Sequence, residues 1–230
     1  AVGGDWLTIT RETIGLRHDP HFWLDVEQFQ QRLAICQTHD HPADEVCPAC
    51  LKPLHEAVKL YRDDFLTGFT LSDCLAFDEW QFFQTEGLRQ TFAATLEQLV
   101  RGLTSQGNYD AALPHARRWL ALDLLHEPAH CQLMKLYAQT GQQAAAVRQY
   151  QECVRILEKE LGVSPQEETT ALYERLRSGP GLPRATIPHR FIQRELERDE
   201  RPVALKCDGV LGIRRLVRRI VVRPGLHLVQ

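Results

Sequence analysis

The chain has 230 residues, of which 43% are hydrophobic and 25% are charged, a composition typical of a globular domain with a real core. No stretch approaches the roughly 18–20 uninterrupted apolar residues of a membrane-spanning helix. Residues 180–230 carry 11 Lys or Arg against 5 Asp or Glu, whereas the remaining 179 residues carry 16 against 25. Because an acidic body repels a phosphate backbone, we do not expect the main domain to bind nucleic acid by itself.

The first sequence signal is an alternation of apolar and polar residues near the N-terminus. Residues 7–10 and 13–16 alternate on either side of Arg11 and Glu12, which predicts a β-hairpin or a bent edge strand. A hairpin of this size is too short to be stable alone, so we expect it to lie against another element.

Three helices are predicted next from the spacing of apolar residues. The first begins near Asp25 and places Val26, Phe29, Leu33 and Cys36 on one face. After a polar loop at residues 39–48, a second helix is expected from Leu51 to Phe65, with Gly68 at its exit. The third helix, in which Phe77, Trp80 and Phe83 supply aromatic bulk, runs to Leu103. We interpret the large aromatic residues of these stripes as core rather than as the lining of a ligand groove: Trp23, Trp80, Trp119, Phe65 and Phe77.

An internal repeat follows, with a period of tetratricopeptide (TPR) length. The segment at residues 107–112 is echoed at residues 141–146, and each segment opens on a glycine and ends on an alanine. In such repeats the glycine turns the chain, and the small residue lets two helices approach closely. The sequence therefore predicts an all-α array of TPR-like helical hairpins, closed by a helix at residues 167–177.

The C-terminal region gives weaker signals. Residues 178–183 have the composition of a linker. The basic stretch at residues 213–223 fits either an amphipathic helix or a strand, and its pattern does not decide between the two. Such a run is usually a solvated face, and contact with DNA or lipid is the alternative.

Cysteine usage predicts a reducing, cytoplasmic environment and raises one metal hypothesis. The seven cysteines lack the spacing of a disulfide framework, and residues 1–6 do not resemble a secretory signal. Cys47 and Cys50 form a C-x-x-C pair that can hold Zn²⁺, with His39, His41 or His55 completing the site. The competing interpretation is a loop with two thiols that leads into the second helix, and no second C-x-x-C decides between them.

The H-E-x-x-H sequence at residues 126–130 matches the zinc-protease motif in letters only. That chemistry needs both histidines one turn apart inside a helix. Pro128 favours a helix start at this point instead, so His126 and His130 should not share a face. With no G-x-S-x-G elbow and no convergent set of titratable groups, the sequence predicts no catalytic residues and no enzyme.

Several segments together carry a resemblance to a known family. They are residues 22–29, 61–69, 77–80, 117–123, 126–130 and 157–165. In order and spacing they resemble the bacterial transcriptional activator domain (BTAD) of SARP-type and large LuxR-type regulators, over roughly two thirds of the chain. The resemblance implies a helical effector domain of residues 22–178 that follows an OmpR-like winged helix.

The resemblance also implies how the flanking segments are used. Residues 1–17 look like the last hairpin of the winged-helix domain, whose recognition helix does not lie in this sequence. Residues 179–230 form a linker and a basic tail, and no G-x-x-x-x-G-K-[ST] loop follows. DNA would therefore be reached only through the winged-helix domain.

The sequence thus predicts a protein-interaction module of a DNA-binding regulator, with no cofactor apart from the possible zinc. RNA polymerase or a second copy of the regulator is the expected partner, and no membrane partner is expected. Helix-surface arguments select six contact residues: Tyr61, Arg62, Phe69, Arg117, Arg118 and Trp119. The alternative is a sensing domain that takes a small molecule or peptide in its helical groove.

Overall fold

In the computed structural model, residues 23–39, 42 and 45–178 are described with their side chains, and residues 7–9, 13–16 and 228–229 by their backbone. These residues contain seven helices and three short strands, so the all-α prediction is confirmed. The helices are α1 (Asp25–Gln37), α2 (Pro48–Leu60), α3 (Leu75–Ser105), α4 (Tyr109–Leu122), α5 (Glu127–Gln139), α6 (Gln143–Leu161) and α7 (Glu167–Ser178).

The strands form one small antiparallel sheet. Strands β1 (Leu7–Ile9) and β2 (Thr13–Leu16) pair as the predicted hairpin, with Leu7 opposite Leu16. A third strand, β3 (Leu228–Val229), pairs with β2 in the order β1-β2-β3. The sequence did not predict this third strand. The basic stretch at residues 213–223 lies outside the described residues.

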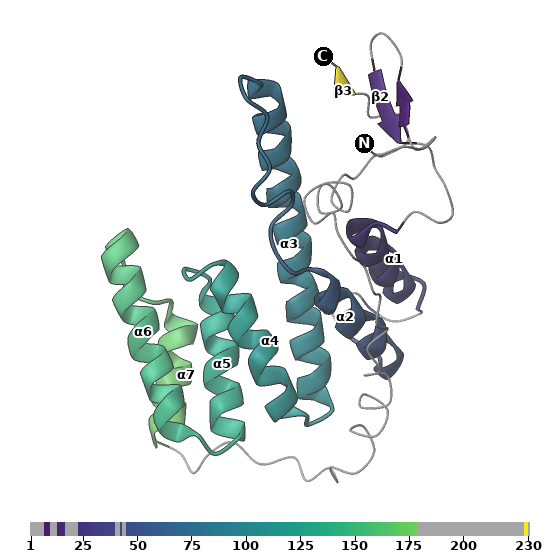
Figure 1. Cartoon of the computed structure of the whole chain (residues 1–230). Helices are drawn as coiled ribbons and strands as arrows, with labels where there is room; N and C mark the ends of the chain where they lie inside the picture. The colour runs from purple at the N-terminus through teal and green to yellow at the C-terminus, as the bar shows by residue number, and fades with distance from the viewer. Residues whose placement is uncertain are drawn as a thin grey trace, which may run out of the picture.

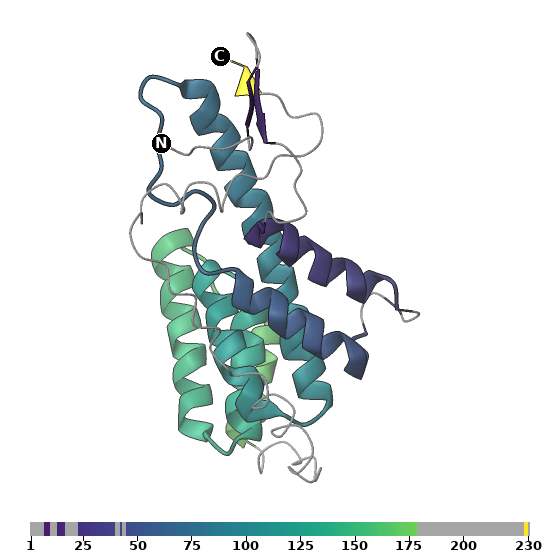
Figure 2. The same ribbon diagram turned by 45° about the vertical axis from the view of Figure 1, so that its right-hand side comes forward.

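The long helix α3 is the axis on which the other helices are arranged (Figures 1 and 2). Helices α1 and α2 pack as one pair, and α2 contacts α3. On the other side, α4 pairs with the C-terminal half of α3, α5 pairs with α6, and α7 contacts both α5 and α6. The N-terminal half of α3 extends past the ends of α4 and α5 (Figure 1).

The predicted repeat is confirmed by two equivalent turns. Gly107 and Gly141 both have left-handed backbone, with φ of 74° and 76°, a conformation that favours glycine. In each turn the residue after the glycine donates its N–H to a carbonyl five residues back, Asn108 to Leu103 at 2.9 Å and Gln142 to Tyr137 at 2.7 Å. The two turns are therefore built alike.

Small buried residues lie at matching positions after each turn. Ala112 in α4 and Ala146 in α6 are 0% and 1% exposed. Because a methyl group occupies little volume, each helix can approach its neighbour closely at this point. The apolar positions Leu99 and Leu133 are equally buried, at 1% each, and fill the seam between successive hairpins.

Two expectations about the N-terminal helices are wrong. The second helix ends at Leu60 and does not reach Phe65. The backbone becomes extended at Tyr61, with φ of −78° and ψ of 97°, so the chain leaves the helix there and Phe65 packs in a separate cluster with Phe77. Trp23, which precedes α1, is 49% exposed rather than buried.

No helix in the described part of the chain is both long and apolar enough to cross a membrane.

Candidate functional site

An open groove of about 390 Å³ runs along one face of the helical array. Its walls come from α3 and α5, which are the first helices of the two hairpins, and from the closing helix α7. Charged side chains of both signs line it, alongside apolar surface from α3, α4 and α7. The charged residues are Glu97, Arg101, Glu127, Lys135, Glu168 and Arg175.

Glu127 fixes the end of this groove. Its side chain is 8% exposed and accepts hydrogen bonds from the Gln166 N–H at 2.9 Å and the Thr169 hydroxyl at 2.7 Å. A carboxylate at the start of α5 is also favoured by the helix dipole. Glu127 therefore joins α5 to the start of α7 and has a structural role at this position.

The histidines of the H-E-x-x-H sequence are placed as expected for a helix start. Pro128 lies in the first turn of α5, and His126 precedes the helix with its ring against Trp119. His130 is 1% exposed, and its two ring nitrogens meet the Leu124 carbonyl at 3.0 Å and the Gln149 amide at 2.8 Å. His130 is thus a core histidine with satisfied nitrogens.

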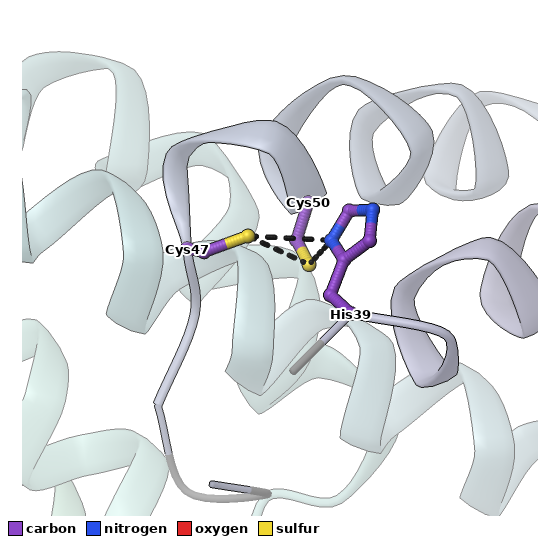
Figure 3. Close-up of side chains that lie close together, drawn as sticks. All are labelled: His39, Cys47 and Cys50. Carbon is purple, nitrogen blue, oxygen red and sulfur yellow. Dashed lines mark hydrogen bonds between the residues drawn. The ribbon is translucent and has the colours of Figure 1, made fainter. Parts of the chain in front are cut away.

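The strongest cluster of chemically reactive groups lies between α1 and α2. His39 follows the last turn of α1, while Cys47 and Cys50 lie at the start of α2, and the three side chains point toward one another (Figure 3). The Cys47 and Cys50 sulfurs are 3.5 Å apart, and the His39 Nδ1 lies 3.3 Å from the first and 3.0 Å from the second. These ligand atoms all lie within 4.8 Å of one another.

Helix geometry explains this convergence. Pro48 starts α2, so Cys47 is its N-cap residue and Cys50 lies within the first turn. Burial raises the pKa of Cys47, but hydrogen bonds from the Cys50 thiol and the nearby backbone N–H groups outweigh it and lower that pKa. Burial, and then the thiols of Cys47 and Cys36, raise the pKa of Cys50. Cys47 is therefore the first of the pair to become a thiolate.

The other histidines predicted as ligands do not join this cluster in the described residues. His41 lies outside them. His55 instead packs edge-on against His115 of α4, with ring centroids 5.5 Å apart. Burial, then His55 and then Arg118, lower the pKa of His115 to about 4.

Three of the six predicted contact residues are engaged within the fold. Trp119 is 6% exposed, which confirms its prediction as a core residue and does not fit an exposed contact, although it is among the residues that line the groove. Arg118 donates to the Val58 and Tyr61 carbonyls and lies 4.5 Å above the Phe92 ring. Tyr61 stacks on that same ring, with centroids 4.1 Å apart. Helix α4 packs against α3 and α5, and Arg118 reaches the end of α2, which a single-helix argument does not detect.

The remaining three contact residues are more accessible. Arg62 and Arg117 are exposed, and Arg117 donates to the Tyr137 hydroxyl at 3.1 Å. Phe69 is half-buried against Phe77.

An apolar surface that sequence reasoning missed lies on the N-terminal part of α3. Leu75, Phe82 and Phe83 are 72%, 60% and 69% exposed. Large exposed aromatic residues that lie together commonly mark a protein-contact surface. The apolar pattern of this helix does not show which of its aromatic residues other segments cover: Phe77 is buried, whereas Phe83 is exposed.

The fold and the groove define the chain's class: a TPR-like array of helical hairpins with an open groove along it. Residues 24–177 match the family model of the bacterial transcriptional activator domain. The chain belongs to this family, and the predicted resemblance is confirmed. It is accordingly a domain of the transcription-regulator class. A search of the curated proteins found no match to the chain.

Proposed function

We propose that residues 22–178 are the protein-docking effector module of a cytoplasmic, DNA-binding transcriptional regulator, and that they carry no enzymatic activity. The observation that carries this proposal is the groove lined by α3, α5 and α7. In a hairpin array, the first helices of successive repeats present one continuous surface, and such surfaces take extended or helical segments of another protein.

The chemistry of the groove favours a protein segment over a small molecule. Ligand pockets are mostly enclosed and apolar, with few polar groups. This groove is open and lined by three acidic and three basic side chains. Charged side chains of both signs select a polar partner and fix the position at which it binds along the groove. They do not provide the apolar enclosure that a small apolar ligand needs.

The exposed residues Leu75, Phe82 and Phe83 offer a second contact surface at the free end of α3. Aromatic side chains supply much of the energy in protein interfaces. Arg62 and Arg117 remain proposed contacts on the surface of the array. We expect RNA polymerase or a second copy of the regulator to occupy these surfaces.

The proposed domain organisation follows from the hairpin. We propose that residues 1–17 end a winged-helix DNA-binding domain, through which the regulator reaches DNA, and that residues 179–230 are a linker and tail. The β1–β2 pairing supports the first assignment.

Capture experiments with charge-reversal variants test the proposal. Purified chain carrying an affinity label is incubated with RNA polymerase, and separately with unlabelled chain and a crosslinker. Lys135→Glu in the groove should weaken capture by about tenfold, because it reverses a lining charge. Arg148→Glu, an exposed position on α6 away from the groove, is the matched control and should bind like wild type.

Replacing Phe82 and Phe83 by serine tests, in the same assay, whether the second contact surface contributes to binding. Failure of the wild-type chain to bind polymerase or itself would count against the proposal. A thermal-shift response to small molecules, with no protein capture, would favour the sensing alternative.

A further inference from the structure

We propose that the junction of α1 and α2 is a structural Zn²⁺ site with four ligands, Cys36, His39, Cys47 and Cys50. Three of these ligand atoms already converge. The sulfur of Cys36, in the last turn of α1, lies beside them, 3.8 Å from the Cys50 carbonyl oxygen. This inference is independent of the docking proposal.

The geometry of the three converged atoms matches a tetrahedral site. With Zn–S bonds of about 2.3 Å and a Zn–N bond of about 2.0 Å, two sulfurs lie roughly 3.8 Å apart, and a sulfur and a nitrogen roughly 3.5 Å. The corresponding distances here are 3.5 Å for the sulfur pair, and 3.3 and 3.0 Å for the nitrogen to each sulfur. Small outward shifts therefore make room for the ion.

Cys36 is the side chain best placed to supply the fourth ligand. It is half-buried, and its sulfur lies 3.8 Å from the Cys50 carbonyl oxygen, across the helix pair. Its sulfur is not among the three atoms that share the 4.8 Å cluster, so we infer that the ion draws it inward.

The sequence spacing supports the same ligand set. Cys36 and His39 form a C-x-x-H pair, and Cys47 and Cys50 form a C-x-x-C pair, so each side of the junction contributes two ligands separated by two residues. Structural zinc sites are commonly built from two such pairs. Three thiolates and a neutral imidazole leave a net charge of −1 on the bound site, and binding releases the thiol protons that remain.

Zinc also has a clear structural task at this position. Helix α1 buries only Phe29 as a fully covered residue. Apart from that packing, an ion pair between Arg32 and Glu56 at 2.8 Å joins it to α2. A metal held by the end of α1 and the start of α2 closes the intervening loop and fixes this hairpin.

Metal analysis of the full chain tests the site directly. Protein purified without chelator should contain one zinc per chain. Co²⁺ added to the metal-free chain should give a tetrahedral visible spectrum, with a thiolate charge-transfer band of the intensity expected for three sulfurs. Absence of zinc together with no tetrahedral Co²⁺ spectrum, or a Cys47–Cys50 disulfide in freshly isolated protein, would overturn the proposal.

Variants identify the ligands. Cys36→Ser should weaken zinc binding by more than the roughly 10- to 100-fold lost when an outer partner of a ligand is removed. It should also reduce the Co²⁺ charge-transfer band by about one third, as expected for the loss of one sulfur in three. Cys74→Ser, a half-buried cysteine outside the cluster, is the control and should keep full zinc content.

The variant His41→Ala tests whether Cys36 or His41 is the fourth ligand. We expect it to keep the metal and the three-sulfur spectrum. Loss of zinc in His41→Ala with full retention in Cys36→Ser would overturn the four-ligand assignment. The Co²⁺ titration of wild-type chain decides the existence of the site even where a variant does not fold.

Discussion

The molecule turns its helices in two different ways. Between α3 and α4 and between α5 and α6, a single left-handed glycine reverses the chain, and the same backbone hydrogen bond closes both turns. Between α1 and α2 the chain instead passes through a longer polar loop that ends at His39 on one side and at Cys47 and Cys50 on the other. A glycine turn is specified by local backbone geometry, whereas the α1–α2 turn depends on side chains that meet across a loop.

The largest expected effect comes from overfilling the helix seams of the glycine-turned hairpins. Ala112→Leu and Ala146→Leu place a bulky side chain where 0% and 1% of the residue is exposed. Each should lower the free energy of unfolding by about 3 kcal/mol, because overpacking forces neighbours out of position. Urea denaturation measures the change. Similar losses at both sites would support equivalent seams, whereas a neutral effect at one site would break the equivalence.

Acidification should weaken the contact between the two regions, where His55 of α2 meets His115 of α4. The pKa of His115 in the fold is about 4, well below its ordinary value near 6.5. Between these values the unfolded chain binds a proton that the folded chain does not, so stability falls as the pH drops from 6.5 to 4 and is unaffected above 6.5. Allowing for partial solvation, we expect a loss of about 2 kcal/mol.

Replacing His115 by Gln removes this titration and should flatten the stability profile over that range. The measurement is chemical denaturation at several pH values. An equally steep profile in the variant would show that other groups control the acid response.

Two glycines of α3 distinguish a helix surface that contacts the α1–α2 region from one that does not. A Cβ on Gly102 would lie 2.7 Å from Leu51 and 2.8 Å from Val46, so Gly102→Ala should destabilise by about 1–2 kcal/mol. A Cβ on Gly87 meets nothing within 4 Å. Gly87→Ala should therefore stabilise by about 0.5–1 kcal/mol through helix propensity alone. Thermal unfolding of the two variants compares them, and equal signs would contradict the described packing.

The turn glycines should give small effects that are equal to each other. Gly107→Ala and Gly141→Ala place a Cβ on left-handed backbone, at a cost of about 1 kcal/mol each. Asparagine tolerates this conformation better and should cost less at both positions. Urea midpoints measure the pair. Unequal costs would indicate that one turn is held by tertiary contacts rather than by its own backbone.

The contrast between the turns also explains what the sequence could predict. The spacing of 34 residues between Gly107 and Gly141 predicted the α3–α4 and α5–α6 hairpins and their seams. These features could be predicted because the residues that determine them recur within each repeat. The zinc hypothesis named Cys47 and Cys50 with His39, His41 or His55, and the structure brings His39, Cys47 and Cys50 together. Cys36 was assigned to the apolar face of its helix, since only the approach of α1 to α2 brings it beside Cys50. The C-x-x-H spacing of Cys36 and His39 was the sequence signal from which Cys36 could have been predicted as a ligand.

Exposure was the property that local patterns predicted least well. Trp119 is predicted as core by its apolar stripe and as a contact by the surface of its own helix, and only the packed array, which covers it to 6% exposure, decides for the core. Conversely, Phe83 looked like core bulk but lies on the extended half of α3 at 69% exposure. Both differences depend on which helices pack together, a property of the whole array.

Hydrogen exchange of the full chain, before and after zinc is removed with a chelator, tests the difference between the two kinds of turn most directly. We expect amides of α1 and of the first turn of α2 to lose protection when the metal is removed. The amides of Asn108 and Gln142, which close the glycine turns, should keep their protection. Unchanged exchange in α1, or an equal loss of protection in all three hairpins, would contradict the distinction.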